Sequence, residues 1–96
     1  MIYIRDKDDS KVFIGTKKSM AYVMAAMVVL NEKPVRLLAR GRSISRAVDV
    51  AEITISKFVK GSSYGDIKIG TETLTNTDGT ITNVSSIDIE ILPASN

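Results

Sequence analysis

Hydrophobic and polar positions follow two patterns along this chain of 96 residues, one typical of helices and one typical of strands. Between residues 43 and 59 the apolar positions recur every three or four residues, which predicts an amphipathic helix with one buried face. The expected core positions on that face are Ile44, Ala47, Val48, Ala51, Ile55, Phe58 and Val59. Val50 and Ile53 fall on the other side, so we expect a monomer to leave them half exposed and a second chain to cover them.

A sharp turn with two cations precedes this helix. In Arg40-Gly41-Arg42 the glycine gives the backbone freedom to turn between a strand and the helix. Ser43 or Ser45 is expected to cap the first turn. Free N–H groups, the helix dipole and two guanidinium groups would meet there, a combination that binds phosphate. The alternative is that these three residues form only a solvated turn.

Three apolar segments precede the turn. Lys11 to Gly15 predicts a short strand, and Met20 to Leu30 predicts a buried helix. Because a membrane-spanning helix needs about 20 residues, this segment is too short to cross a bilayer, and we expect no membrane association. Val35 to Ala39 predicts a second strand, parallel to the first because a helix connects the two.

The last third of the chain predicts a long β-hairpin. Asp66 to Thr75 and Thr80 to Leu92 are the expected strands, and Asp78-Gly79 is a strong turn signal between them. Residues 71–83 contain little apolar material, so this part is expected to project as an arm. We expect residues 1–96 to form a single domain, with residues 1–10 as a leader or an extra edge strand.

Composition and charge narrow the possible functions. The chain has no Cys and no His, so disulfides, thiolate or zinc sites and the usual proton shuttles are excluded. We therefore expect no cofactor, no metal, no small-molecule substrate and no catalytic residue. Residues 1–60 carry 12 Lys and Arg against 6 Asp and Glu, whereas residues 61–96 carry 1 against 5, so an anionic partner should meet the first half.

Five short motifs, in order, carry a resemblance to a known family. They are Val12-Phe13-Ile14-Gly15, Lys17-Lys18, Tyr22-Val23, the run ARGRSISRAVDVAEI from Ala39, and Val84-Ser85-Ser86-Ile87. Together they resemble the Alba family of archaeal chromatin proteins. The resemblance implies an α/β two-layer sandwich of order βαβαββ, with two helices on one face of a four-stranded mixed sheet, similar to the C-terminal domain of bacterial translation initiation factor three. It also implies a homodimer, with further assembly, that binds DNA or RNA in the cytoplasm and associates with the nucleoid.

The same resemblance implies a set of site residues. The nucleic-acid surface would comprise Lys17, Lys18, Arg40, Gly41, Arg42 and Arg46. Their cations would neutralise phosphates rather than read bases. Phe58 matches a family position at which dimers pack against one another, and the alternative is that it is ordinary core.

Several positions depart from the family pattern. Relatives often carry a base where this chain has Thr16, Leu38, Ile55, Thr80 and Asn83. Thr16 stands at the position of the lysine whose acetylation is associated with regulation in the family. Between residues 71 and 83 the only charged residues are the acids Glu72 and Asp78. We therefore expect nucleic-acid binding weaker than in typical members. Two alternatives remain: an Alba-fold dimer that has lost useful nucleic-acid binding and acts as a protein-interaction module, and an enzyme, for which the sequence offers no convincing constellation.

Overall fold

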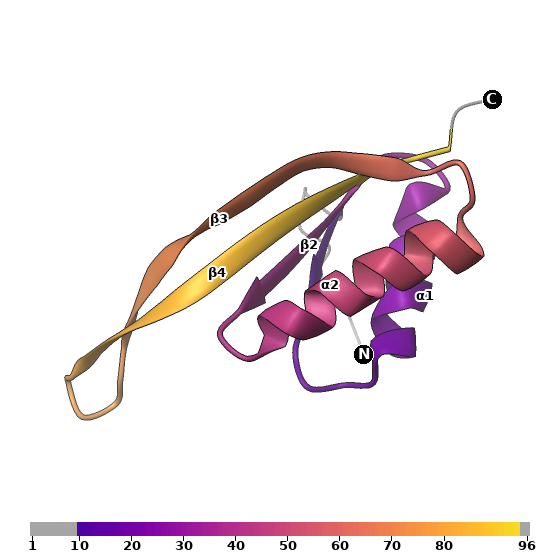
Figure 1. The fold of residues 1–96 in the computed structure, drawn as a ribbon. Helices are drawn as coiled ribbons and strands as arrows, with labels where there is room; N and C mark the ends of the chain where they lie inside the picture. Colours follow the sequence, from indigo (N-terminus) through magenta and orange to yellow (C-terminus); the bar gives the residue numbers. More distant parts are fainter. Residues whose placement is uncertain (1–9, 95–96) are drawn as a thin grey trace.

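The computed structural model describes residues 10–94, in which two helices cover one face of a four-stranded sheet (Figure 1). The elements are β1 (Lys11–Phe13), α1 (Ser19–Leu30), β2 (Val35–Arg40), α2 (Ser43–Ile53), the π-helical turn η1 (Thr54–Phe58), β3 (Ser63–Thr75) and β4 (Ile81–Leu92). The sheet order is β1-β2-β4-β3, with β1 parallel to β2 and the other neighbours antiparallel. The predicted fold class is confirmed. The expected leader or edge strand falls on residues 1–9, outside the described residues, and on Ser10, which directly precedes β1.

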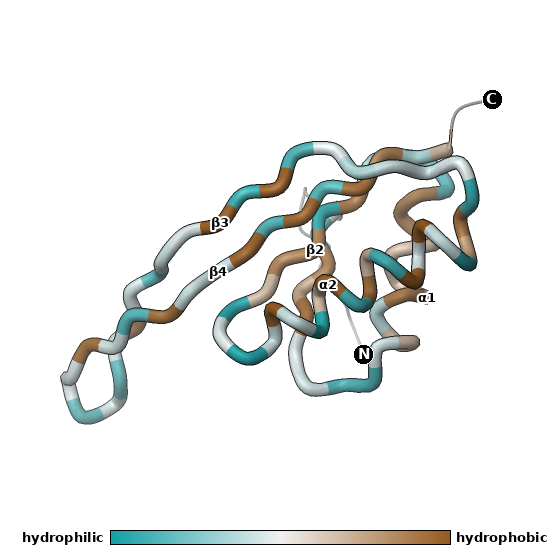
Figure 2. The backbone as a smooth tube through the Cα atoms, in the orientation of Figure 1, coloured by the Kyte–Doolittle hydropathy of each residue, from teal (hydrophilic) through white to brown (hydrophobic). Residues whose placement is uncertain are grey.

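Alternation in β2 and β4 builds the floor of the core. Val35, Leu37 and Ala39 point toward the helices and are buried, whereas the residues between them face the other side of the sheet. Ile91 and Ile89 lie opposite Val35 and Leu37 across the β2–β4 ladder and are also buried. Figure 2 shows hydrophobic and hydrophilic positions alternating along the second half of β4, as expected for a strand with one covered face.

Helix α1 is buried along one side only. Tyr22, Val23, Ala26 and Leu30 face the core. Met24 is 59% exposed and Val28 is 74% exposed, so the prediction of a buried helix is wrong for its outer side. Because both helices lie on the same face of the sheet, each keeps one side in solvent. Within residues 10–94 neither helix is both long and apolar enough to cross a membrane.

The buried face of α2 differs from the predicted one. Its core positions are Ala47, Val50 and Ala51, followed by Thr54 at the start of η1, which again follow the helical spacing. Val50, predicted to be half exposed, is 0% exposed, and Val48, predicted to lie in the core, is 43% exposed. Both predictions are wrong. Thr54 is tolerated in the core because its hydroxyl donates a 2.7 Å hydrogen bond to the Val50 carbonyl. Ile53 is partly buried and packs against the core rather than standing free of it.

The π-helical turn explains the position of Phe58. The Val59 N–H donates to the Thr54 carbonyl, five residues earlier, at 2.7 Å, instead of to the carbonyl four residues earlier. This wider turn rotates the following side chains relative to a regular helix. Phe58 would otherwise continue the buried face, but it is 44% exposed, so the prediction that it belongs to the core is wrong.

The β3–β4 hairpin extends past the helices at its distal end (Figure 1). Its turn is closed by a hydrogen bond from the Asn76 N–H to the Thr80 carbonyl at 2.8 Å, and Gly79 adopts a φ of 88°. The Asp78 carboxylate accepts hydrogen bonds from the N–H and the hydroxyl of Thr80 at 3.0 and 2.7 Å. These bonds favour the ionised carboxylate and lower the pKa of Asp78.

Candidate nucleic-acid interface

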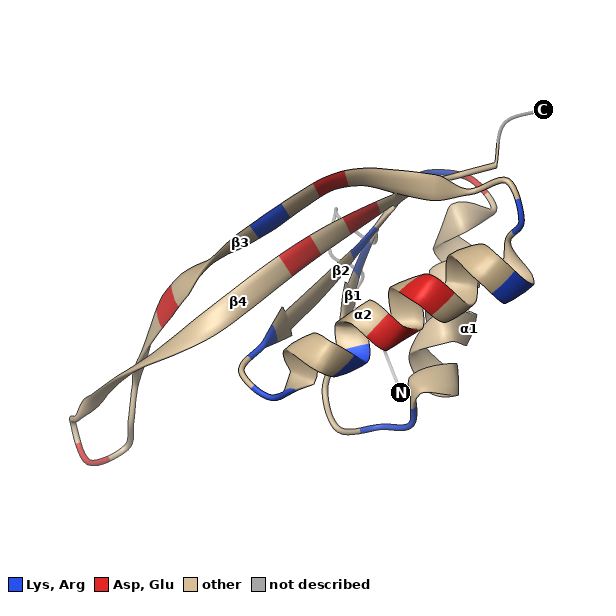
Figure 3. Ribbon diagram, viewed as in Figure 1, with Lys and Arg blue, Asp and Glu red and all other residues tan. Residues whose placement is uncertain are grey.

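Three basic segments meet at one end of the molecule, beside the base of the hairpin (Figure 3). They are the loop between β1 and α1, the turn between β2 and α2, and the second turn of α2. We call this region the basic end and define it by Lys17, Lys18, Arg40, Arg42 and Arg46. The structure thus brings together all the cations that the sequence assigned to the nucleic-acid surface.

The β1–α1 loop is held in place by one tyrosine. The buried Tyr22 hydroxyl accepts hydrogen bonds from the N–H groups of Gly15 and Lys17, at 2.8 and 3.0 Å. A Cβ at Gly15 would lie 3.3 Å from this hydroxyl oxygen, so a glycine suits the close approach. Tyr22 therefore fixes the loop backbone and leaves the side chains of Lys17 and Lys18 exposed.

Arg46 connects this loop to α2. Its Nη1 donates to the Lys17 carbonyl at 2.8 Å. A guanidinium has five N–H donors, so this bond leaves others available for a phosphate. Arg46 thus helps to position the β1–α1 loop, a role that the sequence did not reveal. Its role as a phosphate ligand stays a prediction.

The turn between β2 and α2 depends on its glycine. Gly41 has a φ of 57°, a conformation that L side chains rarely adopt, and its N–H donates to the Ser85 carbonyl at 2.8 Å. Residue Arg42 occupies the N-cap position of α2, and no side chain caps the helix start. The predicted Ser43 or Ser45 cap is therefore wrong, because Ser43 already lies inside the helix. The Ile44 N–H donates to the Gly41 carbonyl at 3.1 Å, and the positive end of the α2 dipole lies beside Arg42.

Among the described residues, one acidic side chain pairs with a cation of the basic end. The Nη1 of Arg40 lies 3.3 Å from Oε1 of Glu72 on β3. Within residues 10–94 the charged groups of Lys17, Lys18 and Arg42 have no ion-pair partner. Sequence reasoning recognised Glu72 as an acid of the arm but missed this contact, because it depends on the register of three strands.

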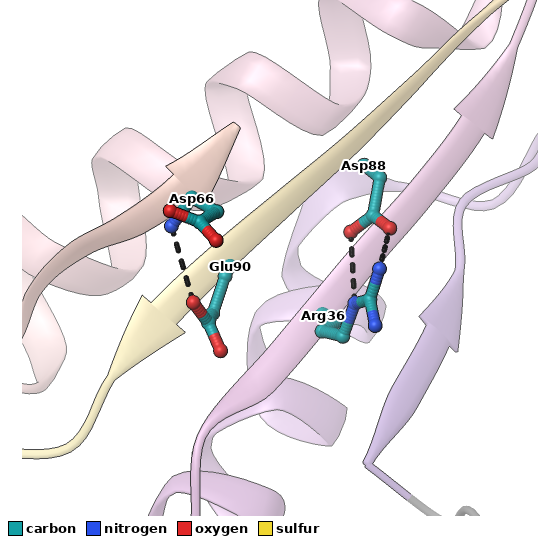
Figure 4. Close-up of polar contacts among 4 residues, drawn as sticks. All are labelled: Arg36, Asp66, Asp88 and Glu90. Atoms are coloured by element: carbon teal, nitrogen blue, oxygen red, sulfur yellow. Dashed lines mark hydrogen bonds and ion pairs between the residues drawn. The ribbon is translucent and has the colours of Figure 1, made fainter. Parts of the chain in front are cut away.

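A second ion pair lies on the helix-free face of the sheet, away from the basic end. Figure 4 shows Arg36 paired with Asp88, whose Oδ1 accepts from the Arg36 Nε at 3.1 Å. Glu90 accepts a 3.1 Å hydrogen bond from the Asp66 N–H near the start of β3. Arg36 is thereby paired with an acid within the sheet and lies outside the basic end.

The distal arm offers polar groups but no cation. Asn76 donates through its amide to the hydroxyls of Thr80 and Thr82, at 2.8 and 2.9 Å. The Thr73 hydroxyl donates to the side-chain oxygen of Asn83 at 3.1 Å. These groups thus satisfy one another in part, and two of them, Thr80 and Asn83, stand at positions where the family resemblance implies a base.

Comparison with known proteins gives the family. The Alba family model matches residues 10–71. The DNA/RNA-binding protein Alba of Methanothrix thermoacetophila is 54% identical over 84 residues, covering 85% of this chain and 93% of the relative. Its namesake from Thermoplasma acidophilum is 43% identical over 86 residues, covering 88% and 96%. The solved structure of Alba from Thermoplasma volcanium is similar with a TM-score of 0.79 at 43% identity, covering 85% of this chain and 98% of that one. The chain therefore belongs to the Alba family.

Proposed function

We propose that this protein binds DNA or RNA without sequence preference, through phosphate contacts made by the basic end. The observation that carries the proposal is the convergence of five exposed or half-exposed cations, of which only Arg40 has an acidic partner within residues 10–94. The relatives named DNA/RNA-binding protein Alba support the same conclusion. A protein of this kind would reside in the cytoplasm, on the nucleoid or on cellular RNA.

The geometry favours contacts to phosphates over contacts to bases. The cations stand on a loop, a tight turn and a helix start, and no side chain caps the start of α2. Such groups position a polyanion but carry no sequence information. The arm adds no cation, so most of the electrostatic affinity must come from the basic end.

We also propose that the protein acts as a homodimer. Beside α2, the helix-facing side of β3 carries Ile67 and Ile69, which are 53% and 82% exposed. Ile44 and Ile87 line a shallow hollow with Ile69, and Val48 lies one helical turn beyond Ile44. These exposed and partly buried aliphatic side chains form a strip, and an exposed apolar patch marks an interaction surface. Val50 is buried in the core, so we place the centre of the dimer surface on this strip instead. The roles of Ile53 and Phe58 in assembly stay predictions.

The dimer surface is tested by placing a charge in the strip. Ile69→Glu should give a monomer in light scattering coupled to size-exclusion chromatography, because a desolvated carboxylate without a partner is costly. Phe13→Glu is the matched control, since Phe13 is 72% exposed but lies on the opposite face of the sheet. A dimer in both variants would reject this surface.

The binding function is tested by the salt dependence of affinity. If six to ten phosphates contact the dimer, the slope of log K against log salt is about −5 to −9. Lys17→Gln with Arg42→Gln removes four cations per dimer and should reduce the slope by about 3.6, without disturbing the Lys17 backbone hydrogen bonds. Lys57→Gln with Lys60→Gln removes the same charge at the far end of the helix and should leave the slope nearly unchanged.

These slopes come from fluorescence anisotropy of labelled duplex DNA and duplex RNA at several salt concentrations. Equal slopes in the two double variants would place the contacts elsewhere. Absence of binding by the parent protein at about 50 mM salt would reject the function itself and favour a module that interacts with proteins.

A further inference from the structure

One ion pair at the basic end, between Arg40 and Glu72, opposes the nucleic-acid binding that the other cations favour. The guanidinium of Arg40 is paired with the carboxylate of Glu72, with Nη1 and Oε1 separated by 3.3 Å. Both side chains are about half exposed, so the pair lies in solvent rather than in the core. A polyanion that approaches Arg40 therefore meets a guanidinium that already has an anionic partner.

The strand register explains why this pair forms. Arg40 lies opposite Ser86 on β4, and Ser86 lies opposite Gly70 on β3, so the three residues share one rung on the helix-free face. Glu72 follows two residues later on the same face of β3, opposite Val84. Ser86 has a small side chain and Gly70 has none. The long Arg40 side chain can therefore cross β4 and reach the carboxylate.

The same arrangement ties the turn to the base of the arm. The Gly41 N–H already anchors the turn to Ser85 on β4. The Arg40–Glu72 pair adds a second tie, this time to β3. An open groove of about 490 Å³ on this face is lined by both members of the pair, by Gly70 and by Ser86. A phosphate can thus approach Arg40 from solvent without moving any strand.

We propose that Glu72 is an intramolecular competitor for the phosphate that binds Arg40. The inference rests on the proposed function and adds an affinity-determining residue to it. In the free protein the carboxylate neutralises Arg40, and bound nucleic acid displaces it. Because an exposed ion pair changes an equilibrium constant by a factor of up to about five, the competition lowers affinity without abolishing it. Nucleic acid must then hold the basic end through Lys17, Lys18 and Arg42 while it displaces two carboxylates per dimer.

The test compares three variants by anisotropy with one labelled duplex at about 50 mM salt. Glu72→Gln keeps the size of the side chain and removes its charge, and it should tighten binding by roughly three- to tenfold for two sites per dimer. Asp66→Asn is the matched control, because it removes one acid from the same strand but leaves Arg40 paired; it should change affinity by less than about twofold. Adding Glu72→Gln to an Arg40→Gln protein should give no gain, since the competed group is then absent.

Each outcome decides between the alternatives. If Glu72→Gln and the parent bind equally well, the competition does not exist, although the proposed function stands. A gain that is matched by Asp66→Asn, or that persists without Arg40, would reflect net charge alone and would overturn the inference. If neither the parent nor Glu72→Gln binds at this salt concentration, the proposed function fails and the role of Glu72 fails with it.

Discussion

Replacing Tyr22 by phenylalanine isolates the hydroxyl that holds the β1–α1 loop. The change removes one oxygen atom from a buried ring and leaves the packing of α1 intact. It leaves the N–H groups of Gly15 and Lys17 without their acceptor. Because the Arg46 contact to the Lys17 carbonyl is unaffected, the loop keeps one of its two attachments.

The expected cost follows from the two hydrogen bonds. A typical intramolecular hydrogen bond contributes about 0.5 to 1.5 kcal/mol net, so the pair contributes about 1 to 3 kcal/mol. The loop lies at the surface, and a small shift would let water reach both amides, so we expect a loss of about 2 kcal/mol. For a domain of this size each kcal/mol lowers Tm by about 4 to 8 °C, which gives a drop of about 8 to 16 °C.

The assay is urea unfolding followed by circular dichroism, at one fixed protomer concentration because a dimer links stability to concentration. Tyr64→Phe is the matched control, since the Tyr64 hydroxyl donates to Glu52 at the surface and its loss should cost at most about 0.5 kcal/mol. A loss below about 0.5 kcal/mol for Tyr22→Phe, or equal losses in the two variants, would show that the hydroxyl does not hold the loop.

Three further predictions test the turn, the core and one titrating group. Gly41→Ala should cost about 1 to 2 kcal/mol in urea unfolding, because φ is 57° while nothing lies within 4 Å of the added Cβ; Gly41→Asn should cost less, and equal costs would contradict a purely conformational origin. Val50→Ala should cost about 2 kcal/mol and Val28→Ala under about 0.5 kcal/mol, since their exposed fractions are 0% and 74%; the reverse order in thermal unfolding would refute the assigned helix faces. Desolvation and then the hydrogen bond to Glu52 raise the pKa of Tyr64 to about 12. The folded-state pKa of Tyr64 exceeds the unfolded value, so the associated stability is present below pH 10 and is lost as pH rises through about 12. An NMR titration should show a lower Tyr64 pKa in Glu52→Gln, and an unchanged pKa would show that the hydrogen bond to Glu52 does not raise it.

The sequence predicted the strands and the order of elements, because these depend on local patterns, whereas the cations of the basic end were implied by the family resemblance. The apolar segment from Val35 to Ala39 located β2, and the turn signal at Asp78-Gly79 located the hairpin. Arg46 contacts the Lys17 carbonyl, and Arg40 and Arg42 flank Gly41 at the turn before α2. Their role in binding nucleic acid stays a prediction. The local pattern could not show which of two faces of α2, nearly equal in hydrophobicity, is buried.

That choice explains the errors in α2. Apolar residues occupy more than half of its circumference, so Val48 and Val50 both fit a helical repeat. Packing against α1 and the sheet buries the face that includes Thr54, whose hydroxyl is satisfied within the helix and which a hydropathy pattern counts as polar. The π-helical turn then moves Phe58 outward, and no local signal in the sequence predicts such a turn. The Arg40–Glu72 pair was missed for a similar reason, since it joins residues 32 positions apart through strand register.

The most direct test of the central claim is an amide chemical-shift map of the protein titrated with an arbitrary-sequence duplex at low salt. The account predicts that the largest changes fall in residues 15–18 and 40–46 and at the base of the hairpin, and that a second, unrelated sequence gives the same map. Changes centred on α1 or on the start of β2 around Arg36, or maps that differ between sequences, would contradict phosphate binding by the basic end.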